Sequence, residues 1–125
     1  MFRWLSVLFI FSFFHCHANT QNSETRREQQ FENEYVKVWK TIIMPNQPLK
    51  MHRHDRLRVV VGLKGGTLTK IEETGETSDL VIETGKAYWF DKDPPNTLHA
   101  DLNESDEPIE VMLIEFKIPN IAPSP

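Results

Sequence analysis

Short runs of strand-forming residues, each ended by a turn of glycine, proline or asparagine, place the strongest limit on how this chain folds. From Phe31 onward the sequence predicts eight or nine such runs, and no window has a helical period long enough to assign a helix. The predicted strands cover residues 35–44, 49–54, 57–63, 67–71, 79–83, 87–90, 98–102 and 109–116. Many short strands separated by turns predict an antiparallel all-β sandwich or barrel.

The turns between these runs have the residues that tight reversals need. Residues 45–48 (PNQP) end the first strand, and residues 73–76 (ETGE) place a glycine between two strands. Residues 64–67 (KGGT) predict a β-hairpin, because glycine adopts the positive φ that a two-residue hairpin loop requires. The same four residues lack the surrounding spacing of a phosphate-binding loop.

Three histidines are the most chemically specific residues of the predicted strands. His52 and His54 lie two residues apart, so on one strand they point to the same face. Two imidazoles on one face can share a small target such as a metal ion or an anion. A third imidazole must come from a distant segment, and His99 supplies it, because His15 and His17 lie in a predicted leader.

The residues around these histidines, and their spacing, resemble the two motifs of the cupin superfamily. The first cupin motif consists of glycine, His-x-His, glutamate and glycine, and the second of glycine, proline, histidine and asparagine. The matching positions in this chain are His52, His54, Gly65, Gly85, His99 and Asn103. The resemblance covers residues 31–118 and is to small single-domain cupins with one conserved barrel. It implies an all-β fold, a single antiparallel jelly-roll β-barrel with a site inside its mouth.

Two positions depart from the cupin motifs. Asn46 replaces the first glycine, and asparagine tolerates left-handed backbone better than most residues, so the turn is expected to survive. Arg58 replaces the glutamate that the superfamily uses as a metal ligand. By strand parity Arg58 faces the same way as His52 and His54. An arginine cannot ligate a metal, and its permanent charge repels a cation.

Three interpretations of this site follow. In the first, implied by the resemblance, His52, His54 and His99 hold a divalent transition metal (zinc, nickel, iron, copper or manganese), and Arg58 binds an anionic substrate. In the second, no metal binds, and Arg58 with the histidines forms a cationic pocket for a carboxylate. In the third, the polar cluster belongs to a barrel that serves only for packing or dimerisation. Cupins include oxygenases, isomerases and lyases, so the resemblance selects no reaction and leaves open whether the protein is an enzyme.

Arg58, Asp101 and Asn103 are the predicted ligand-binding residues. Asp101 has the strand parity of His99, which predicts a carboxylate that faces the cavity and acts as a base or orients a histidine. The alternative for Asp101 is a surface aspartate at the end of a strand. Asn103 occupies the asparagine position of the second cupin motif.

The N-terminus has the composition of a secretory signal peptide over residues 1–18. Arg3 gives a short positive region, an apolar run follows it, and cleavage is expected after Ala18. The apolar run is too short to span a bilayer. A lipid anchor on Cys16 is the alternative, which the bulky His15 before the cysteine disfavours. The sequence thus predicts export, to the periplasm or the medium, and a mature protein without thiols or disulfides.

The remaining chain divides into three segments. Residues 19–30 carry no large apolar side chain and predict a polar linker, residues 31–118 form the cupin-like barrel domain, and residues 119–125 are a proline-rich tail. The formal net charge is −4, and removal of residues 1–18 takes away one positive charge, Arg3, which leaves −5. An acidic chain without a basic stripe argues against nucleic acid or a membrane surface as the partner and favours a small-molecule ligand. A homodimer is compatible with this fold class.

Overall fold

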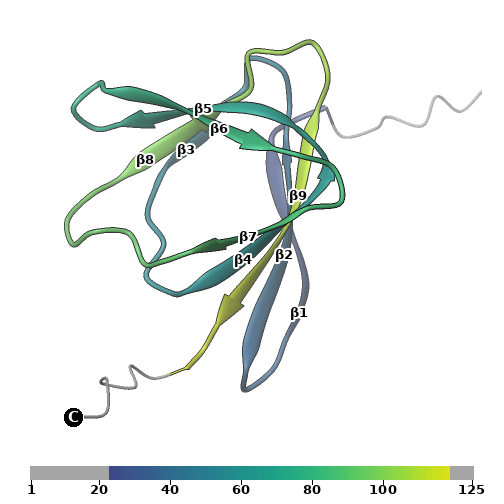
Figure 1. Ribbon diagram of the computed structural model, residues 1–125, viewed down its shortest axis with the longest axis vertical. Helices are drawn as coiled ribbons and strands as arrows, with labels where there is room; N and C mark the ends of the chain where they lie inside the picture. Colours follow the sequence, from purple (N-terminus) through teal and green to yellow (C-terminus); the bar gives the residue numbers. More distant parts are fainter. Residues whose placement is uncertain (1–22, 119–125) are drawn as a thin grey trace, which may run out of the picture.

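The computed structural model describes residues 23–118, which form two antiparallel β-sheets (Figure 1). The five-stranded sheet has the order β1-β2-β9-β4-β7, and the four-stranded sheet has the order β3-β8-β5-β6. The strands of the first sheet are β1 (Arg26–Glu32), β2 (Val36–Ile43), β9 (Ile109–Phe116), β4 (Arg58–Lys64) and β7 (Ala87–Phe90). Those of the second sheet are β3 (Leu49–His52), β8 (His99–Leu102), β5 (Gly66–Glu72) and β6 (Thr77–Ile82).

The two sheets confirm the predicted all-β class and jelly-roll arrangement, but they do not close into a barrel. No strand of one sheet is paired with a strand of the other in the part of the chain that the structure describes. Figure 1 shows two layers that approach each other near β9 and diverge towards β7 and β8. The strands nearest this open side, β3, β7 and β8, have four residues each.

The predicted segments at the two ends of the chain lie largely outside this description. The signal peptide (1–18) and the proline-rich tail (119–125) fall outside residues 23–118, so their assignment stays a prediction. No helical segment within the described residues has the length and hydrophobicity needed to cross a bilayer.

β1 is the one strand that the sequence does not predict. All eight predicted strands occur, with ends shifted by two residues or fewer, but residues 26–30 were assigned to the polar linker and instead lie in β1. That assignment is wrong because β1 is an edge strand, paired with β2 alone. An edge strand with one side in water needs no alternating apolar residues, and charged side chains protect it from aggregation.

The turn at residues 64–67 is not a hairpin. β4 pairs with β7 and β9, whereas β5 pairs with β6 and β8, so this turn carries the chain from one sheet to the other. Neither glycine of the turn has a positive φ. Gly65 is required for close approach instead, because a Cβ at that position would lie 2.3 Å from the carbonyl oxygen of Ile82.

Other turns have the backbone conformations that their residues predict. Asn46 has a φ of 56°, so asparagine indeed replaces the motif glycine in left-handed backbone. Gly75, with a φ of 86°, lies in the turn between the paired strands β5 and β6, and Gly85 has a φ of 81°. These turns fix the directions in which the strands leave them.

The hydrophobic core lies between the two sheets and draws on both. It consists of buried aliphatic residues from β2, β4 and β9 on one side and from β5 and β6 on the other, namely Ile43, Val60, Ile109, Val111, Leu113, Leu68 and Ile82. Full burial of each such side chain stabilises the fold by about 1.5–3 kcal/mol. Because this core fills the closed side of the jelly roll, the open side is left for polar residues.

Candidate metal centre

Strand pairing brings the two histidine motifs together. His52 at the end of β3 lies directly opposite His99 at the start of β8. His54 follows two residues after β3 has ended, so the strand predicted for residues 49–54 is too long. A loop contact turns His54 towards the other two: its backbone N–H donates a hydrogen bond of 2.7 Å to Asp93 Oδ2.

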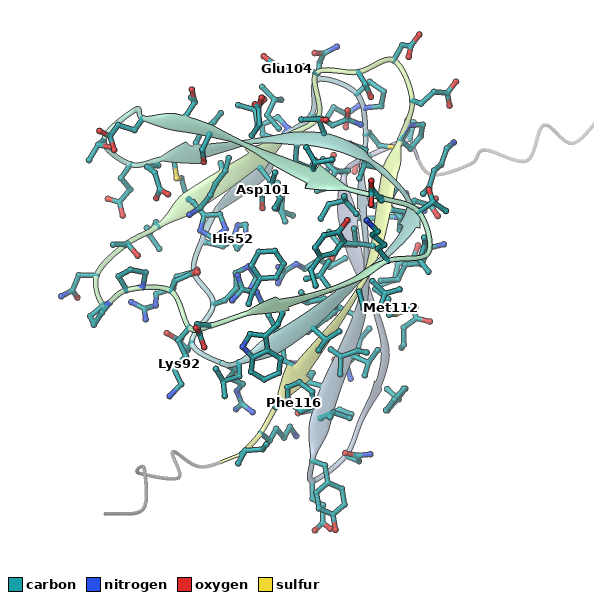
Figure 2. All side chains as sticks on the ribbon, in the orientation of Figure 1. His52, Lys92, Asp101, Glu104, Met112 and Phe116 are labelled. Carbon is teal, nitrogen blue, oxygen red and sulfur yellow. The ribbon has the colours of Figure 1, made fainter. Side chains whose placement is uncertain are left out.

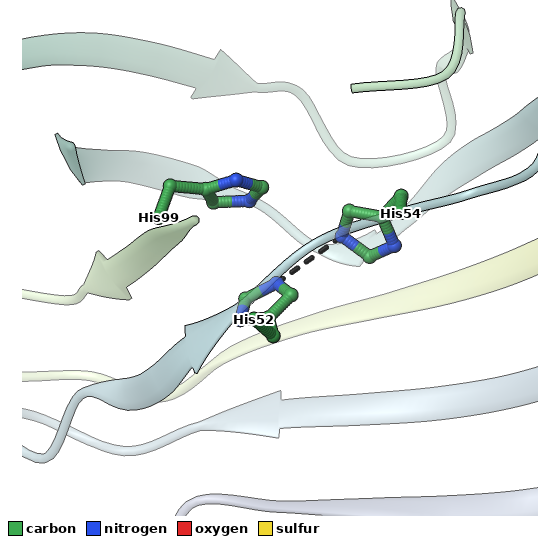
Figure 3. A group of neighbouring side chains, drawn as sticks. All are labelled: His52, His54 and His99. Carbon is green, nitrogen blue, oxygen red and sulfur yellow. Dashed lines mark hydrogen bonds between the residues drawn. The ribbon is translucent and has the colours of Figure 1, made fainter. Parts of the chain in front are cut away.

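The three imidazole rings converge on one point (Figure 3). The ring centroids lie 4.8 Å apart for His52 and His54, 4.5 Å for His52 and His99, and 5.5 Å for His54 and His99. One ring nitrogen from each residue lies within 4.8 Å of the other two. Zinc binds imidazole nitrogens at about 2.0–2.1 Å, so ligand atoms around one ion are about 3–4 Å apart. The spacing fits a shared ion after small side-chain movements.

The outer ring nitrogen of His52 is held in the way that a metal-binding histidine requires. Nδ1 of His52 donates to the carbonyl oxygen of Lys50 at 2.6 Å, which leaves its Nε2 as an acceptor. This Nε2 lies 3.1 Å from Nε2 of His54, a contact that needs one proton between the two nitrogens. A metal ion would take the place of that proton. Partners on the second nitrogen fix the tautomer and orientation of a ligating imidazole.

Burial keeps the imidazoles of His54 and His99 neutral. It lowers the pKa of His54 to about 2, with the positive charge of Arg58 acting in the same direction. Burial also lowers the pKa of His99, although the carboxylates of Asp101 and Asp93 oppose this effect. Neutral imidazole is the form that binds metals, so at neutral pH these two rings need not lose a proton before an ion enters.

Asp101 lies on the same side of the histidines as their free nitrogens. Its Oδ2 is 3.6 Å from Nε2 of His52 and 3.8 Å from Nε2 of His99. Figure 2 shows His52 and Asp101 on the face of the four-stranded sheet that is turned towards the other sheet. The carboxylate is therefore at the spacing of a fourth donor, as well as that of a base. Asp101 faces the cavity as the sequence predicts, and the surface alternative is wrong.

Asp93 is a site residue that no sequence motif indicates. Its Oδ2 accepts the hydrogen bond from the His54 backbone and lies 3.4 Å from Nδ1 of His99, and its Oδ1 is 3.5 Å from Nη2 of Arg58. One carboxylate thus connects residues of both motifs. It lies in the loop between β7 and β8, and the only signal in the sequence is an aspartate placed before the two prolines of that loop.

Arg58 is buried in the cavity wall, with a guanidinium that is already engaged. Nη1 donates to the carbonyl oxygen of Asp91 at 2.7 Å, Nη2 pairs with Asp93, and the guanidinium carbon lies 5.2 Å from the centre of the Phe90 ring. Strand parity therefore predicts its direction correctly. These partners give Arg58 a structural part, because they join β4 to the loop after β7. Its predicted role in binding a ligand stays a prediction.

Asn103 also has a structural part. It is completely buried, and its side-chain amide donates to the carbonyl oxygens of Ile43 and Glu107 at 2.9 and 2.7 Å. Its side-chain oxygen accepts hydrogen bonds from the backbone and hydroxyl of Ser105. Every polar atom of the side chain thus has a partner within the protein, and Asn103 is not among the residues that line the adjoining cavity, so its ligand-binding role stays a prediction.

A cavity of about 220 Å³ adjoins the histidines. Its polar part is lined by His54, His99, Arg58 and Asp101, and also by Arg27, Thr41, Lys70, Ser78, Asp79, Asp91 and Asp93. Its remaining wall comes mainly from apolar side chains of both sheets, among them Leu49, Val60, Leu68, Phe90 and Leu113. The site therefore combines a possible ion-binding point with room for a small, partly apolar molecule.

Comparison with solved structures places this architecture among known proteins. A cupin domain from Bordetella pertussis Tohama I is similar over 78% of this chain and 98% of its own length, with 26% identity and a TM-score of 0.68. An RmlC-like cupin family protein from Methanocaldococcus jannaschii matches over 78% and 84%, with 13% identity and a TM-score of 0.58. The polyketide cyclase RemF from Streptomyces resistomycificus matches over 74% and 65%, with 13% identity and a TM-score of 0.55. The last two similarities show the fold alone.

The chain thus has the double-stranded β-helix fold of cupins, and its resemblance to that superfamily is confirmed. No protein-family model matches the sequence. No curated protein matches it either. The fold and the histidine cluster define a small cupin-fold protein whose site is compatible with metal binding.

Proposed function

We propose that this protein binds one divalent transition metal ion through His52, His54 and His99, with Asp101 as a fourth donor, and recognises a small anionic molecule in the adjoining cavity. The convergence of three imidazoles from two distant segments carries this proposal. Zinc, nickel, iron, copper and manganese all accept such a mixed imidazole and carboxylate set. The bound ion would supply Lewis-acid character to an oxygen atom of the molecule in the cavity.

Asp101 supports this proposal because it compensates for the loss of the motif glutamate. The cupin motif takes its carboxylate from the position that Arg58 occupies here, on β4. In this chain a carboxylate from β8 lies 3.6 and 3.8 Å from two of the candidate ligand nitrogens. A carboxylate from β8 would thus take the place of the one that the motif supplies from β4.

The charge of Arg58 does not prevent binding of a cation. Its guanidinium is directed to Asp91 and Asp93, and the negative charge of Asp93 partly offsets it. The same contacts weaken the metal-free alternative, in which Arg58 would bind the carboxylate of a ligand. We therefore favour the metal-binding function.

We also propose that the protein works outside the cytoplasm. Residues 1–18 support this proposal through their positive start, their apolar run and the small residue at position 18. A mature chain without cysteine suits an oxidising compartment, because it has no thiol that could be oxidised.

Metal analysis of protein purified without an affinity tag tests the proposed function. We expect about one transition metal ion per chain, either as purified or after incubation with each candidate metal and desalting. His99→Ala should lose the ion and keep the fold, as judged by circular dichroism. Arg56→Ala is the matched control, because Arg56 lies in the same segment, two residues after His54, and is exposed.

Two results would count against the proposal. Wild-type protein that takes up none of the five metals has no functional metal site. Equal loss of metal in the Arg56 control and the His99 variant would show that binding depends on general integrity and not on the three rings.

A further inference from the structure

A second arginine, Arg27, lines the same cavity. It lies in β1, directly opposite Thr41 of β2, and both side chains contribute to the cavity wall. Arg27 also lines a neighbouring hollow that reaches His52. Its side chain therefore borders both the cavity lined by His54 and His99 and the hollow beside His52. The sequence does not indicate this residue, because β1 itself is not predicted.

The guanidinium of Arg27 has no partner among residues 23–118. Its Nε is buried without a hydrogen bond, and the side chain forms no ion pair with any described carboxylate. Asp101 and Glu115 raise its pKa from a distance, but burial has the larger effect and lowers it. A buried donor left unpaired destabilises a protein, so such a group calls for an explanation.

The neighbouring arginines show that this state is peculiar to Arg27. Arg58, in the wall of the same cavity, has Asp91 and Asp93 as partners. Arg26, the preceding residue, pairs with Glu28 at 2.8 Å. Both of these arginines thus have carboxylate or carbonyl partners, whereas Arg27 lines the cavity with its buried Nε unpaired.

We propose that Arg27 is the receptor for the carboxylate of a small organic acid that occupies the cavity with its hydrocarbon part against the apolar wall. This inference deepens the proposed function, since it names the class of molecule, and it rests on the same cavity. A guanidinium presents two parallel N–H groups that match a carboxylate. The aliphatic and aromatic wall, with Leu49, Leu68 and Phe90, accommodates the carbon chain. A volume of about 220 Å³ limits that molecule to a few carbon atoms.

Paired ligands that differ only in charge test this assignment. We would titrate butyrate and butyramide into metal-free and metal-loaded protein and follow binding by NMR chemical shifts. Wild type should bind butyrate more tightly than butyramide in both states. Arg27→Met should bind butyrate about 10–100-fold more weakly, which corresponds to the loss of a charge-assisted hydrogen bond. Arg26→Met, the matched control on the same strand, should bind butyrate like the wild type.

Thermal unfolding without ligand supplies a readout that a merely structural arginine would not give. Because Arg27→Met removes a buried and unpaired donor, its unfolding midpoint should rise by about 4 °C or more. A lower midpoint in this variant would show that Arg27 supports the fold, and would overturn the proposal. Equal binding of butyrate by the wild type and Arg27→Met, or no preference for butyrate over butyramide in the wild type, would overturn it too.

The two proposals fail separately. Wild-type protein that binds no metal but prefers butyrate through Arg27 would remove the metal centre and keep the carboxylate receptor. Protein that holds one metal ion per chain but does not distinguish the two ligands would do the reverse.

Discussion

At the scale of single residues, the site depends on which carboxylate each cationic or metal-binding group faces. Asp101 lies beside the Nε2 atoms of His52 and His99, whereas Asp93 lies beside Nδ1 of His99 and the guanidinium of Arg58. The two aspartates therefore have different expected roles. Asp101 is placed to contact an ion, and Asp93 is placed to orient the residues that do.

Asp101→Asn separates these roles. We expect the variant to bind zinc or nickel about 10–100-fold more weakly, because an amide oxygen is a poorer donor than a carboxylate, with unfolding little changed. Metal competition with a chromogenic chelator measures the effect. Asp55→Asn is the matched control: this carboxylate pairs with Arg53 and is exposed, so it should leave affinity unaltered. Unchanged affinity in Asp101→Asn would remove Asp101 from the donor set.

Arg58→Met should destabilise the protein by about 3 kcal/mol, because it leaves the buried charge of Asp93 without its cation. Urea unfolding measures this loss. The double variant Arg58→Met/Asp93→Asn should recover part of it, giving a coupling free energy of about 1–2 kcal/mol. Strictly additive losses would mean that the two side chains do not stabilise each other.

The depressed pKa of His54 predicts how the metal-free protein responds to acid. The pKa is about 2 in the fold against 6.5 for the ordinary side chain. Below pH 6.5 the unfolded chain therefore takes up a proton that the folded chain refuses, and stability falls as the pH falls. From pH 7 to 5 this residue should remove about 2 kcal/mol of unfolding free energy. Urea titrations at both pH values, in the presence of EDTA, measure this loss of unfolding free energy. The loss should be smaller in His54→Gln. Equal losses in the wild type and the variant would show that another group causes it.

Motif and strand parity predict the site in part. They indicate the three histidines, the inward direction of Arg58 and that of Asp101, because these follow from spacing along the chain. Asp93 and Arg27 are not predictable in this way. The position of Asp93 depends on a loop that folds back to the residues after β3. The position of Arg27 depends on an edge strand whose polar sequence does not predict a strand.

At the scale of elements, glycines that carry the chain between the sheets are as important as those in tight turns. At Gly65 the chain passes so close to β6 that a methyl group would collide with the backbone at Ile82. At Gly75 the backbone is left-handed, but there is open space around it. The two positions thus separate steric contact from backbone strain.

Gly65→Ala should destabilise the protein by about 2–3 kcal/mol, because one of the two sheets must move to admit the methyl group. Gly75→Ala, the comparison variant, should lose only about 1 kcal/mol through its positive φ. Chemical denaturation measures both. The reverse order would show that residues 64–67 relax freely and do not fix the distance between the sheets.

The sequence predicts the strands that have an apolar face, but it does not predict which strands pair with one another. Alternation and turn residues locate eight strands to within two residues. The misread turn at 64–67 has the composition of a hairpin, and only the partners of β4 and β5 show that it crosses between sheets. Strand partners are set by contacts distant in sequence, which a local pattern does not contain.

At the scale of the whole molecule, the open jelly roll explains where the site lies. The core lies between the two sheets, and no strand of one sheet pairs with a strand of the other among residues 23–118. The histidines at the facing ends of β3 and β8 and the loop with Asp93 surround this open side. A cavity with polar groups at one end and apolar walls elsewhere follows directly from this division.

The most direct test of this account is an anomalous scattering map, measured at the absorption edge of the metal that the protein takes up. We predict one strong peak about 2.0–2.2 Å from a ring nitrogen of each of His52, His54 and His99, with Asp101 oriented towards it. Metal-loaded crystals with no peak among these rings, or with a peak that only two of them reach, would contradict the claim that the two distant segments form one metal centre.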